Sequence, residues 1–279
     1  MMRSGFSVLV VLSFVFTSCS HDRSTSPVPD TGLNEIAYID VSPEVAEIEI
    51  DNSGRLQAVA YDASDNPIDG VTFDWVSSDN SVATVDANGE VTVHGPGRAV
   101  ITASCGSDTS RGAEVTPYRV VYKNSFETAE DTIGWHYPVG SPYLQVFWND
   151  TPPGGNSKSL YVSGIEVFPT AYYDLEPVNR DRYVTLQVWG KTIAGKGSVY
   201  LRLKDQPSDS QMDHLDVLID YPEWRLYKAR TVLFCPAGEV LRIELWCGHF
   251  IYWWQILVDE LEIREILSTD SEGKPREDI

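Results

Sequence analysis

Residues 82–93 read Val-Ala-Thr-Val-Asp-Ala-Asn-Gly-Glu-Val-Thr-Val, and this stretch decides the fold of the N-terminal half. Two β-rich runs flank Asn88-Gly89, and both of these residues tolerate the positive φ angles of a tight hairpin turn. Further short alternating runs surround the hairpin, at 36–41, 56–61, 71–76 and 99–103. Regular turns between short strands predict a small β-sandwich over residues 35–118.

The order of residues in this segment adds a family resemblance. The segment carries, in order, Asp40-Val41-Ser42-Pro43, Trp75-Val76-Ser77-Ser78-Asp79, Val82-Ala83-Thr84-Val85-Asp86 and Gly97-Arg98-Ala99-Val100-Ile101-Thr102-Ala103. This series resembles the bacterial immunoglobulin-like group 2 domain. The resemblance implies an immunoglobulin-like sandwich that is common in exported bacterial surface proteins and often serves as a spacer. Trp75 is expected in its core, because buried aromatic residues dominate such cores.

Residues 119–266 form a second strand-rich segment that holds every tryptophan except Trp75. Aliphatic residues alternate with polar and aromatic ones in runs near 183–189, 198–204 and 240–247. Since side chains of a strand point alternately to its two faces, the aliphatic set predicts a core. We therefore expect an all-β chain, in which the immunoglobulin-like β-sandwich precedes a larger antiparallel jelly-roll sandwich.

The opposite faces of these strands combine aromatic rings with planar hydrogen-bonding groups. Such a mixture suits a sugar, whose C–H faces stack on rings while its hydroxyls bond to amide, guanidinium and carboxylate groups. The predicted binding platform comprises Tyr183, Gln187, Trp189, Tyr200, Arg202, Arg242, Glu244 and Trp246. The alternative is that these side chains are half-buried cross-strand partners, or lie beneath a loop or the first domain.

Short motifs of the second segment carry a further resemblance. They are Asn124-Ser125-Phe126-Glu127, the run 155–163, the run 183–189 and Val258-Asp259-Glu260-Leu261-Glu262-Ile263. Together they resemble carbohydrate-binding modules with a galactose-binding-like jelly roll. The resemblance implies a polysaccharide or glycan partner. It also implies a structural calcium (Ca²⁺), with Glu127 and Asp259 as its carboxylate ligands and backbone oxygens near Ser157 and Lys158. The alternative is that both carboxylates are exposed or capping acids.

The N-terminus has the pattern of an export signal. A positive start and the apolar run Phe6–Phe16 lead to Thr17-Ser18-Cys19, which resembles a bacterial lipobox. We expect a signal peptide over 1–18, a lipid on Cys19 and a flexible tether over 19–34. By the family rule Ser20 favours the outer membrane of the bacterial cell envelope. The alternative is an ordinary secretory signal with a coincidental cysteine.

Composition and the absence of catalytic motifs argue against two classes of function, nucleic-acid binding and catalysis. The 21 basic and 41 acidic residues leave a net charge of −20, so nucleic-acid binding is not expected. Residues 257–262 resemble the Glu-x-Asp-x-x-Glu strand of one retaining glycosidase family, but Leu257 replaces the nucleophilic glutamate. No G-x-S-x-G sequence occurs. We therefore expect no enzyme, and we expect Cys235 and Cys247 to be buried free thiols.

The remaining features leave two functional hypotheses. The first is a non-catalytic, lipid-anchored surface protein that binds carbohydrate through the jelly roll. The alternative is a structural or adhesive protein that contacts other proteins through the aromatic run at 248–254, above all Trp253 and Trp254. The polar tail 267–279 is expected to be disordered.

Overall fold

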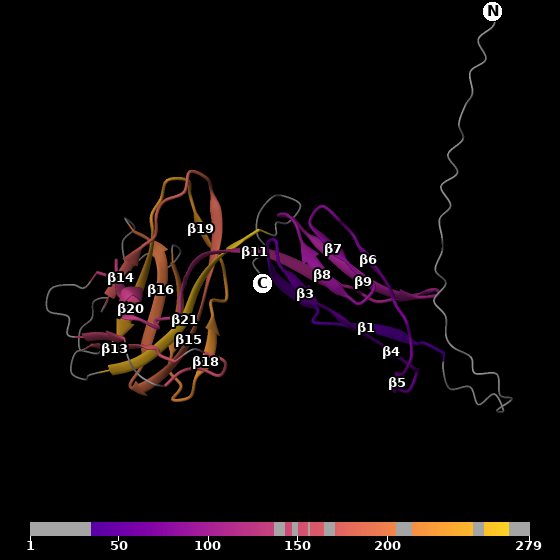
Figure 1. Ribbon diagram of the computed structural model, residues 1–279, viewed down its shortest axis with the longest axis horizontal. Coiled ribbons are helices and arrows are strands. Elements are labelled where there is room, and N and C mark those ends of the chain that lie inside the picture. Colours follow the sequence, from indigo (N-terminus) through magenta and orange to yellow (C-terminus); the bar gives the residue numbers. More distant parts are fainter. Residues whose placement is uncertain are drawn as a thin grey trace, which may run out of the picture.

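The computed structural model describes residues 35–136, 143–146, 150–155, 157–164, 171–204, 214–247 and 254–267. In these ranges the regular structure consists of β-strands and one short 3-10 helix, η1 (Ala129–Thr132). Figure 1 shows two β-rich halves linked by the strands β11 (Ala113–Asn124) and β21 (Trp254–Ile266). The predicted all-β fold is confirmed. A search of the same ranges finds no helix with the length and apolar character that a membrane span requires.

The N-terminal half is a sandwich of short strands. Its sheets have the orders β1-β4-β5, β3-β8-β7 and β10-β9-β11, and in the last sheet β6 pairs with β9 and β2 with β11. The strands are β1 Tyr38–Ser42, β2 Val45–Glu49, β3 Ser53–Arg55, β4 Gln57–Tyr61, β5 Pro67–Ile68, β6 Asp74–Ser77, β7 Ala83–Val85, β8 Glu90–Val93, β9 Ala99–Cys105 and β10 Asp108–Thr109. Ile101 and Val91 are fully buried between the sheets, and Trp75 packs against this core.

The hairpin at 82–93 forms where the sequence predicts, but its turn is longer than two residues. The backbone N–H of Asp86 donates to the carbonyl of Glu90 at 3.0 Å, which closes the loop. In this turn only Gly89 has a positive φ, of 78°. The Asp86 carboxylate instead accepts the N–H groups of Asn88 and Glu90, each at 2.8 Å. An aspartate side chain therefore stabilises this turn in place of a second positive φ angle.

The C-terminal half is a larger sandwich of two antiparallel sheets. One sheet has the order β14-β20-β16-β17, and the other contains β12, β13, β21, β15, β18 and β19. The strands are β12 Tyr143–Val146, β13 Leu160–Gly164, β14 Ala171–Asp174, β15 Arg182–Ala194, β16 Gly197–Leu203, β17 His214–Ile219, β18 Arg225–Lys228, β19 Leu233–Cys235 and β20 Leu241–Cys247. Their arrangement confirms the predicted second, larger jelly-roll sandwich.

The core of this half lies between the two sheets and follows the predicted alternation. Leu186 of β15, Leu201 of β16 and Ile243 of β20 are fully buried in one cluster. Burying a leucine or isoleucine side chain contributes about 1.5–3 kcal/mol, so this shared core holds the sheets face to face. Cys235 and Cys247 are buried thiols that form no disulfide, as predicted. Burial raises the pKa of the Cys247 thiol to about 12.

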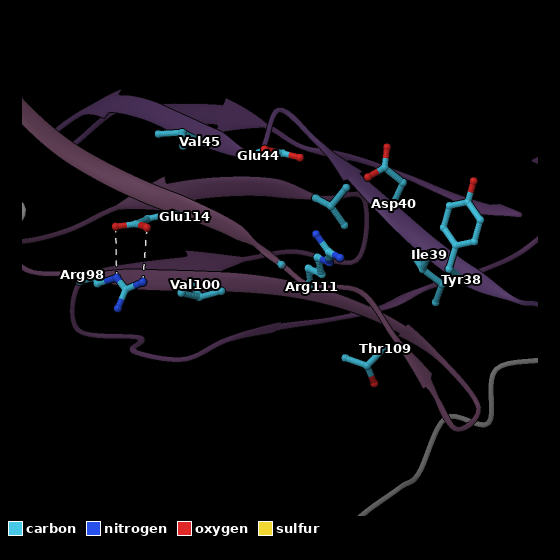
Figure 2. A pocket seen from close by; sticks show the side chains of 12 residues that line it. Tyr38, Ile39, Asp40, Glu44, Val45, Arg98, Val100, Thr109, Arg111 and Glu114 are labelled. Atoms are coloured by element: carbon cyan, nitrogen blue, oxygen red, sulfur yellow. Dashed lines mark hydrogen bonds and ion pairs between the residues drawn. The ribbon is translucent and has the colours of Figure 1, made fainter. Parts of the chain in front are cut away.

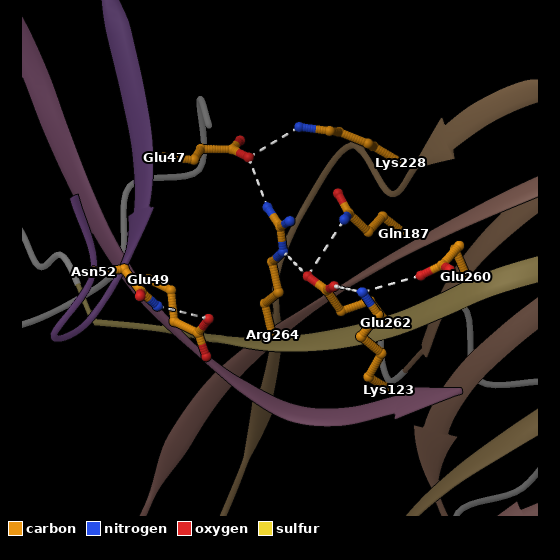
Figure 3. A network of polar contacts seen from close by, with 9 residues as sticks. All are labelled: Glu47, Glu49, Asn52, Lys123, Gln187, Lys228, Glu260, Glu262 and Arg264. Atoms are coloured by element: carbon orange, nitrogen blue, oxygen red, sulfur yellow. Dashed lines mark hydrogen bonds and ion pairs between the residues drawn. The ribbon is translucent and has the colours of Figure 1, made fainter. Parts of the chain in front are cut away.

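The two halves share one strand and one cluster of charges. The first part of β11 pairs in parallel with β2, and its second part pairs antiparallel with β21. Beside this strand, the carboxylate of Glu47 on β2 accepts from Lys228 Nζ and Arg264 Nη1, both at 2.9 Å (Figure 3). A small cavity of about 240 Å³ lies next to these groups. Residues 118 and 119, where the sequence predicts the change of domain, lie within β11.

Several predicted features fall outside the described residues. They are the signal segment 1–18, Cys19, the tether, the run 248–253 with Trp253, and residues 268–279. These features remain predictions.

Candidate functional site

The outer surface of the four-stranded sheet carries a band of aromatic and charged side chains. Alternate residues of each strand fill the core, so the intervening ones point outward. We call this surface the β16 face. Its residues are Tyr172 and Asp174 of β14, Arg242, Glu244 and Trp246 of β20, Ser198, Tyr200 and Arg202 of β16, and His214 and Asp216 of β17.

Glu244 is the polar centre of the β16 face. Only 1% of it is exposed. Its Oε1 accepts from Arg202 Nε at 2.8 Å and Nη2 at 2.7 Å, while its Oε2 accepts from Trp246 Nε1 at 2.9 Å. The Trp246 ring also packs against Tyr200, with centroids 5.4 Å apart and planes tilted by 59°. One buried carboxylate therefore orients a guanidinium and an indole ring.

A second arginine–carboxylate pair lies on the neighbouring strand. Arg242 donates to Asp174 through Nε at 2.6 Å and Nη2 at 2.9 Å, and Lys204 Nζ lies 3.0 Å from the same carboxylate. Burial alone would raise the pKa of Asp174, but the hydrogen bonds from Arg242 and Lys204 outweigh it and lower that pKa. The Arg242 guanidinium lies 4.0 Å from the centroid of the Tyr172 ring. Tyr172 in turn stacks on His136, at 5.1 Å.

The last strand of this sheet, β17, also contributes side chains to the β16 face. His214 packs on Tyr200 with ring centroids 5.6 Å apart, and Asp216 lies opposite Tyr200 in the strand register. Burial raises the pKa of the Tyr200 hydroxyl, so it remains protonated and can donate a hydrogen bond at neutral pH. The β16 face thus presents fixed rings beside donors and acceptors, as sugar recognition requires.

The structure divides the predicted platform between two surfaces. Five of its eight members lie on the β16 face, but Tyr183, Gln187 and Trp189 belong to β15 in the opposite sheet. Since both sheets bury their aliphatic sides in one core, their outer surfaces point away from each other. The prediction of one continuous platform was therefore wrong. Alternation identifies the outer side of a strand, but it does not say which sheet the strand joins.

The three remaining residues have other partners. Tyr183 packs against Phe234, with ring centroids 5.0 Å apart. Gln187 Nε2 donates to Glu262 at 3.3 Å, close to the junction of the halves (Figure 3). Trp189 lies opposite Leu226 of β18 in the strand register. Their partners favour the alternative of half-buried cross-strand neighbours for this part of the platform.

The predicted platform lacks five residues of the β16 face, Tyr172, Asp174, Ser198, His214 and Asp216, and it lacks His136 at the margin. Tyr172 and Asp174 belong to the short run Ala-Tyr-Tyr-Asp at 171–174, while His136 and His214 lie at the margins of the face. Alternation in 171–174 was the signal that marks β14 as a strand with an aromatic, acidic side. His214 begins the alternating run 214–219, which places it on the outer side of β17, whereas His136 has no such pattern and is found only through the Tyr172 ring that it contacts.

The predicted calcium ligands lie away from the β16 face, with Asp259 in β21 and Glu127 in the loop that follows β11, and they are close enough to influence each other. Glu127 accepts from the N–H and hydroxyl of Ser157 at 3.1 and 2.9 Å and from the N–H of Lys158 at 3.3 Å. Asp259 is fully buried. Its Oδ1 accepts the N–H of Glu260 at 2.8 Å, but its Oδ2 has no hydrogen-bond partner. Burial, together with the charges of Glu260 and Glu127, raises the pKa of Asp259 to about 7.

An unpaired buried carboxylate oxygen beside other carboxylates fits a cation ligand. Among the described residues no group of three or more histidine, cysteine, aspartate or glutamate side chains has a metal-binding arrangement. Calcium takes six to eight oxygen ligands, so Glu127 and Asp259 would need backbone carbonyls or water to complete its shell. The backbone N–H groups of Ser157 and Lys158 both donate to Glu127 and hold its carboxylate in place.

A hollow of about 630 Å³ lies in the N-terminal half, between β1 and the strands β9 to β11 (Figure 2). It lies where the chain passes from β1 in one sheet to β2 in another. Arg98 and Glu114 form an ion pair at its wall, at 3.1 Å. Asp40, Glu44 and Arg111 also line it. Because charges of both signs are spread over several strands, the hollow favours no single class of ligand.

The adhesive alternative relied on aromatic side chains at 248–254. Of these, Trp254 begins β21 and packs, half-buried, against the core of the C-terminal half. Trp253 lies outside the described residues. The described part of this run is thus part of the sandwich rather than a free contact surface.

Comparison with known proteins supports the resemblance of the N-terminal segment. Residues 35–116 match the family model of the bacterial Ig-like domain (group 2). No curated protein matches the chain.

Among solved structures, the chain is similar to the CBM22-1 xylan-binding domain of Xyn10C from Paenibacillus barcinonensis. The identity is 18%, the TM-score is 0.41, and the match covers 54% of this chain and 96% of that domain. A structure described as CBM4 matches at 14% identity and a TM-score of 0.35, over 51% of this chain and 97% of its own. An intimin mutant of EHEC O157:H7 matches at 21% identity and a TM-score of 0.23, over 33% of this chain and 55% of the intimin chain.

Proposed function

We propose that the C-terminal half binds carbohydrate through the β16 face, without catalysis, and that the immunoglobulin-like half serves as a spacer. One observation carries the proposal: Glu244 holds the Trp246 ring and the Arg202 guanidinium on one outward surface. A ring held by a buried hydrogen bond loses little freedom when a sugar stacks on it, which lowers the entropic cost of binding.

The neighbouring polar groups supply directional contacts. A guanidinium has five N–H donors, and the contact of Arg242 with Asp174 uses Nε and Nη2. The N–H groups on Nη1 of Arg242 remain for a sugar hydroxyl. Sugar hydroxyls can also bond to the Tyr200 hydroxyl and to the Asp216 carboxylate. The net charge of −20 disfavours polyanions, so the proposed ligand is a neutral glycan rather than one rich in uronic acids.

The proposal contains no reaction. Leu257, which stands where a retaining glycosidase of the resembling pattern has its nucleophile, is fully buried in β21. Leucine has no carboxylate, so it cannot act as the nucleophile that forms the covalent glycosyl intermediate of a retaining glycosidase. We therefore infer binding alone.

We further propose that the chain is attached to the bacterial outer membrane by a lipid on Cys19, with the tether before the spacer. Two or more acyl chains give stable anchoring, because each buried methylene contributes about 0.8 kcal/mol. Replacement of Cys19 by alanine, followed by mass spectrometry and membrane fractionation, tests this part. An unlipidated but exported wild-type chain would refute the anchor and leave the binding proposal intact.

The test of binding uses the two outer surfaces as experiment and control. Trp246→Ala removes a ring from the β16 face, whereas Trp189→Ala removes one from the opposite sheet. On an array of neutral and acidic glycans, and then by calorimetry on the best ligand, Trp246→Ala should weaken binding about tenfold or more. Trp189→Ala should bind like the wild type. Equal losses in both variants, or no glycan bound by the wild type, would refute the proposal.

A further inference from the structure

The strand β17 (His214–Ile219) has a free edge. It is the last strand in the order β14-β20-β16-β17, and among the described strands only β16 pairs with it. A groove of about 580 Å³ runs along its other edge, between β17 and residues 227–231, which comprise the end of β18 and the three residues after it. The described part of the chain therefore leaves one edge of the four-stranded sheet uncovered.

This edge has few of the features that prevent pairing with another strand. Proteins protect free edges with proline, bulges, inward charges or very short strands. β17 is six residues long, contains no proline and pairs with β16 without a register shift. Its inward residues Leu215, Val217 and Ile219 are apolar. On the outward side, 44% of Leu218 is exposed.

We propose that two copies of this chain pair through β17, antiparallel about a twofold axis at Val217. In an antiparallel pair, directly opposite residues point to the same face, so inward residues must meet inward residues. Pairing centred on Val217 satisfies this rule. It places Leu215 opposite Ile219 of the second copy, and His214 opposite Asp220.

Charge distinguishes this register from its neighbours. Moving the centre to Asp216 would place that carboxylate opposite its own copy. Moving the centre to Leu218 would place Asp216 opposite Asp220. Like charges directly opposite each other destabilise a strand pair, whereas Asp216 opposite Leu218 avoids the repulsion.

The dimer would extend the four-stranded sheet to eight strands and bring two β16 faces side by side. Under the proposed function, whose test is separate, such a surface would bind one polysaccharide at two places, with a gain from avidity. Each copy carries a net charge of −20, so the copies repel at low ionic strength. Salt screens this repulsion, and the dimer should therefore become tighter as salt increases.

Sedimentation velocity of the purified chain up to about 200 µM, at low and high salt, tests the dimer. The wild type should dimerise, more strongly at high salt. Leu218→Lys should be monomeric, because it places a charge on the edge. Val76→Lys is the matched control: this residue is 57% exposed, on a strand of the other half, and its change should leave the dimer intact. Circular dichroism checks that both variants remain folded.

Cysteine cross-linking tests the register independently. A mixture of Asp216→Cys and Leu218→Cys chains should form a covalent heterodimer under mild oxidation, because opposite residues in the pair lie within disulfide range. Each variant alone places its cysteines diagonally, beyond that range, and should cross-link poorly. A wild-type chain that stays monomeric at every salt concentration would overturn the proposal. Cross-linking of Leu218→Cys alone would overturn the register.

Discussion

At the scale of single residues, Glu244 has the largest role in the candidate site. Its carboxylate is almost fully buried although it points to the outer side of the sheet. A buried charge requires compensation, and Arg202 and Trp246 provide it. The side chain that arranges the ring is therefore itself inaccessible, and its importance should appear first in stability.

Glu244→Ala should destabilise the chain by about 3–5 kcal/mol, because it removes the buried carboxylate that neutralises the mostly buried Arg202 guanidinium. Urea unfolding followed by fluorescence measures this change. Asp216→Asn, an exposed acid on the same face, is the control and should stay within about 0.5 kcal/mol of the wild type. A loss below about 1 kcal/mol for Glu244→Ala would show that Arg202 finds another partner or solvent.

Asp174 should make the fold sensitive to acid. Its pKa is lowered in the folded chain, since hydrogen bonds from Arg242 and Lys204 outweigh its burial. A lowered pKa contributes stability that is fully present above the unfolded value of about 3.9 and is lost as pH falls through the folded value. The stability difference between wild type and Asp174→Asn should therefore be largest near neutral pH and shrink below about pH 4. Unfolding midpoints measured against pH provide the check, and a difference that is independent of pH would contradict it.

The calcium ion that the resemblance implies also belongs to this scale, because its binding would depend on the Oδ2 of Asp259, which has no hydrogen-bond partner. A bound ion at 100 times its dissociation constant stabilises the fold by about 2.7 kcal/mol. A chelator should therefore lower the unfolding temperature of the wild type, and added calcium should restore it. In Asp259→Asn the chelator should have no effect. An unchanged wild-type midpoint would remove the metal and leave Asp259 as a buried acid.

At the scale of strands, the sequence predicts local features well. The alternation in β15, β16 and β20 correctly predicts the buried side of each strand, as Leu186, Leu201 and Ile243 show. This is possible because the two sides of a strand follow from the chain geometry alone. The assignment of strands to sheets depends on pairing between distant segments, such as β15 with β21. Local alternation contains no information on that pairing, so Trp189 and Trp246 were placed together although they lie on opposite surfaces.

The predicted need for glycine in the hairpin turn can be tested at Gly89. Gly89 has a φ of 78°, and a Cβ at this position would lie 2.6 Å from the Leu56 carbonyl oxygen and 3.0 Å from the Trp75 ring. Gly89→Ala should cost about 2 kcal/mol or more, from the backbone conformation and the contact together. Gly70→Ala is the control, because its φ of 77° is similar but its Cβ would have no neighbour within 4 Å. Equal losses would show that the backbone conformation alone determines the cost.

At the scale of the whole molecule, the two halves are joined by more than a linker. β11 pairs with strands of both halves, and Leu267, which follows β21, donates its N–H to the carbonyl of Pro117 at 2.9 Å. Leu267 also accepts the N–H of Gly97 at 3.0 Å. An N-terminal half with such contacts fixes the direction of the β16 face, whereas a flexible linker would leave it free.

The contact between the two halves can be tested through Glu47 of the N-terminal half, which bonds both Lys228 and Arg264 of the C-terminal half. Glu47→Lys replaces two attractions with repulsions, while Glu44→Lys changes an exposed charge that lines the hollow of the N-terminal half. Because the halves share a strand, the wild type should unfold in a single calorimetric transition. Glu47→Lys should split or broaden this transition at low salt, and Glu44→Lys should not. High salt should restore the single transition, since screening weakens exposed charges most. Two independent transitions in the wild type would show instead that β11 joins two separately folding units.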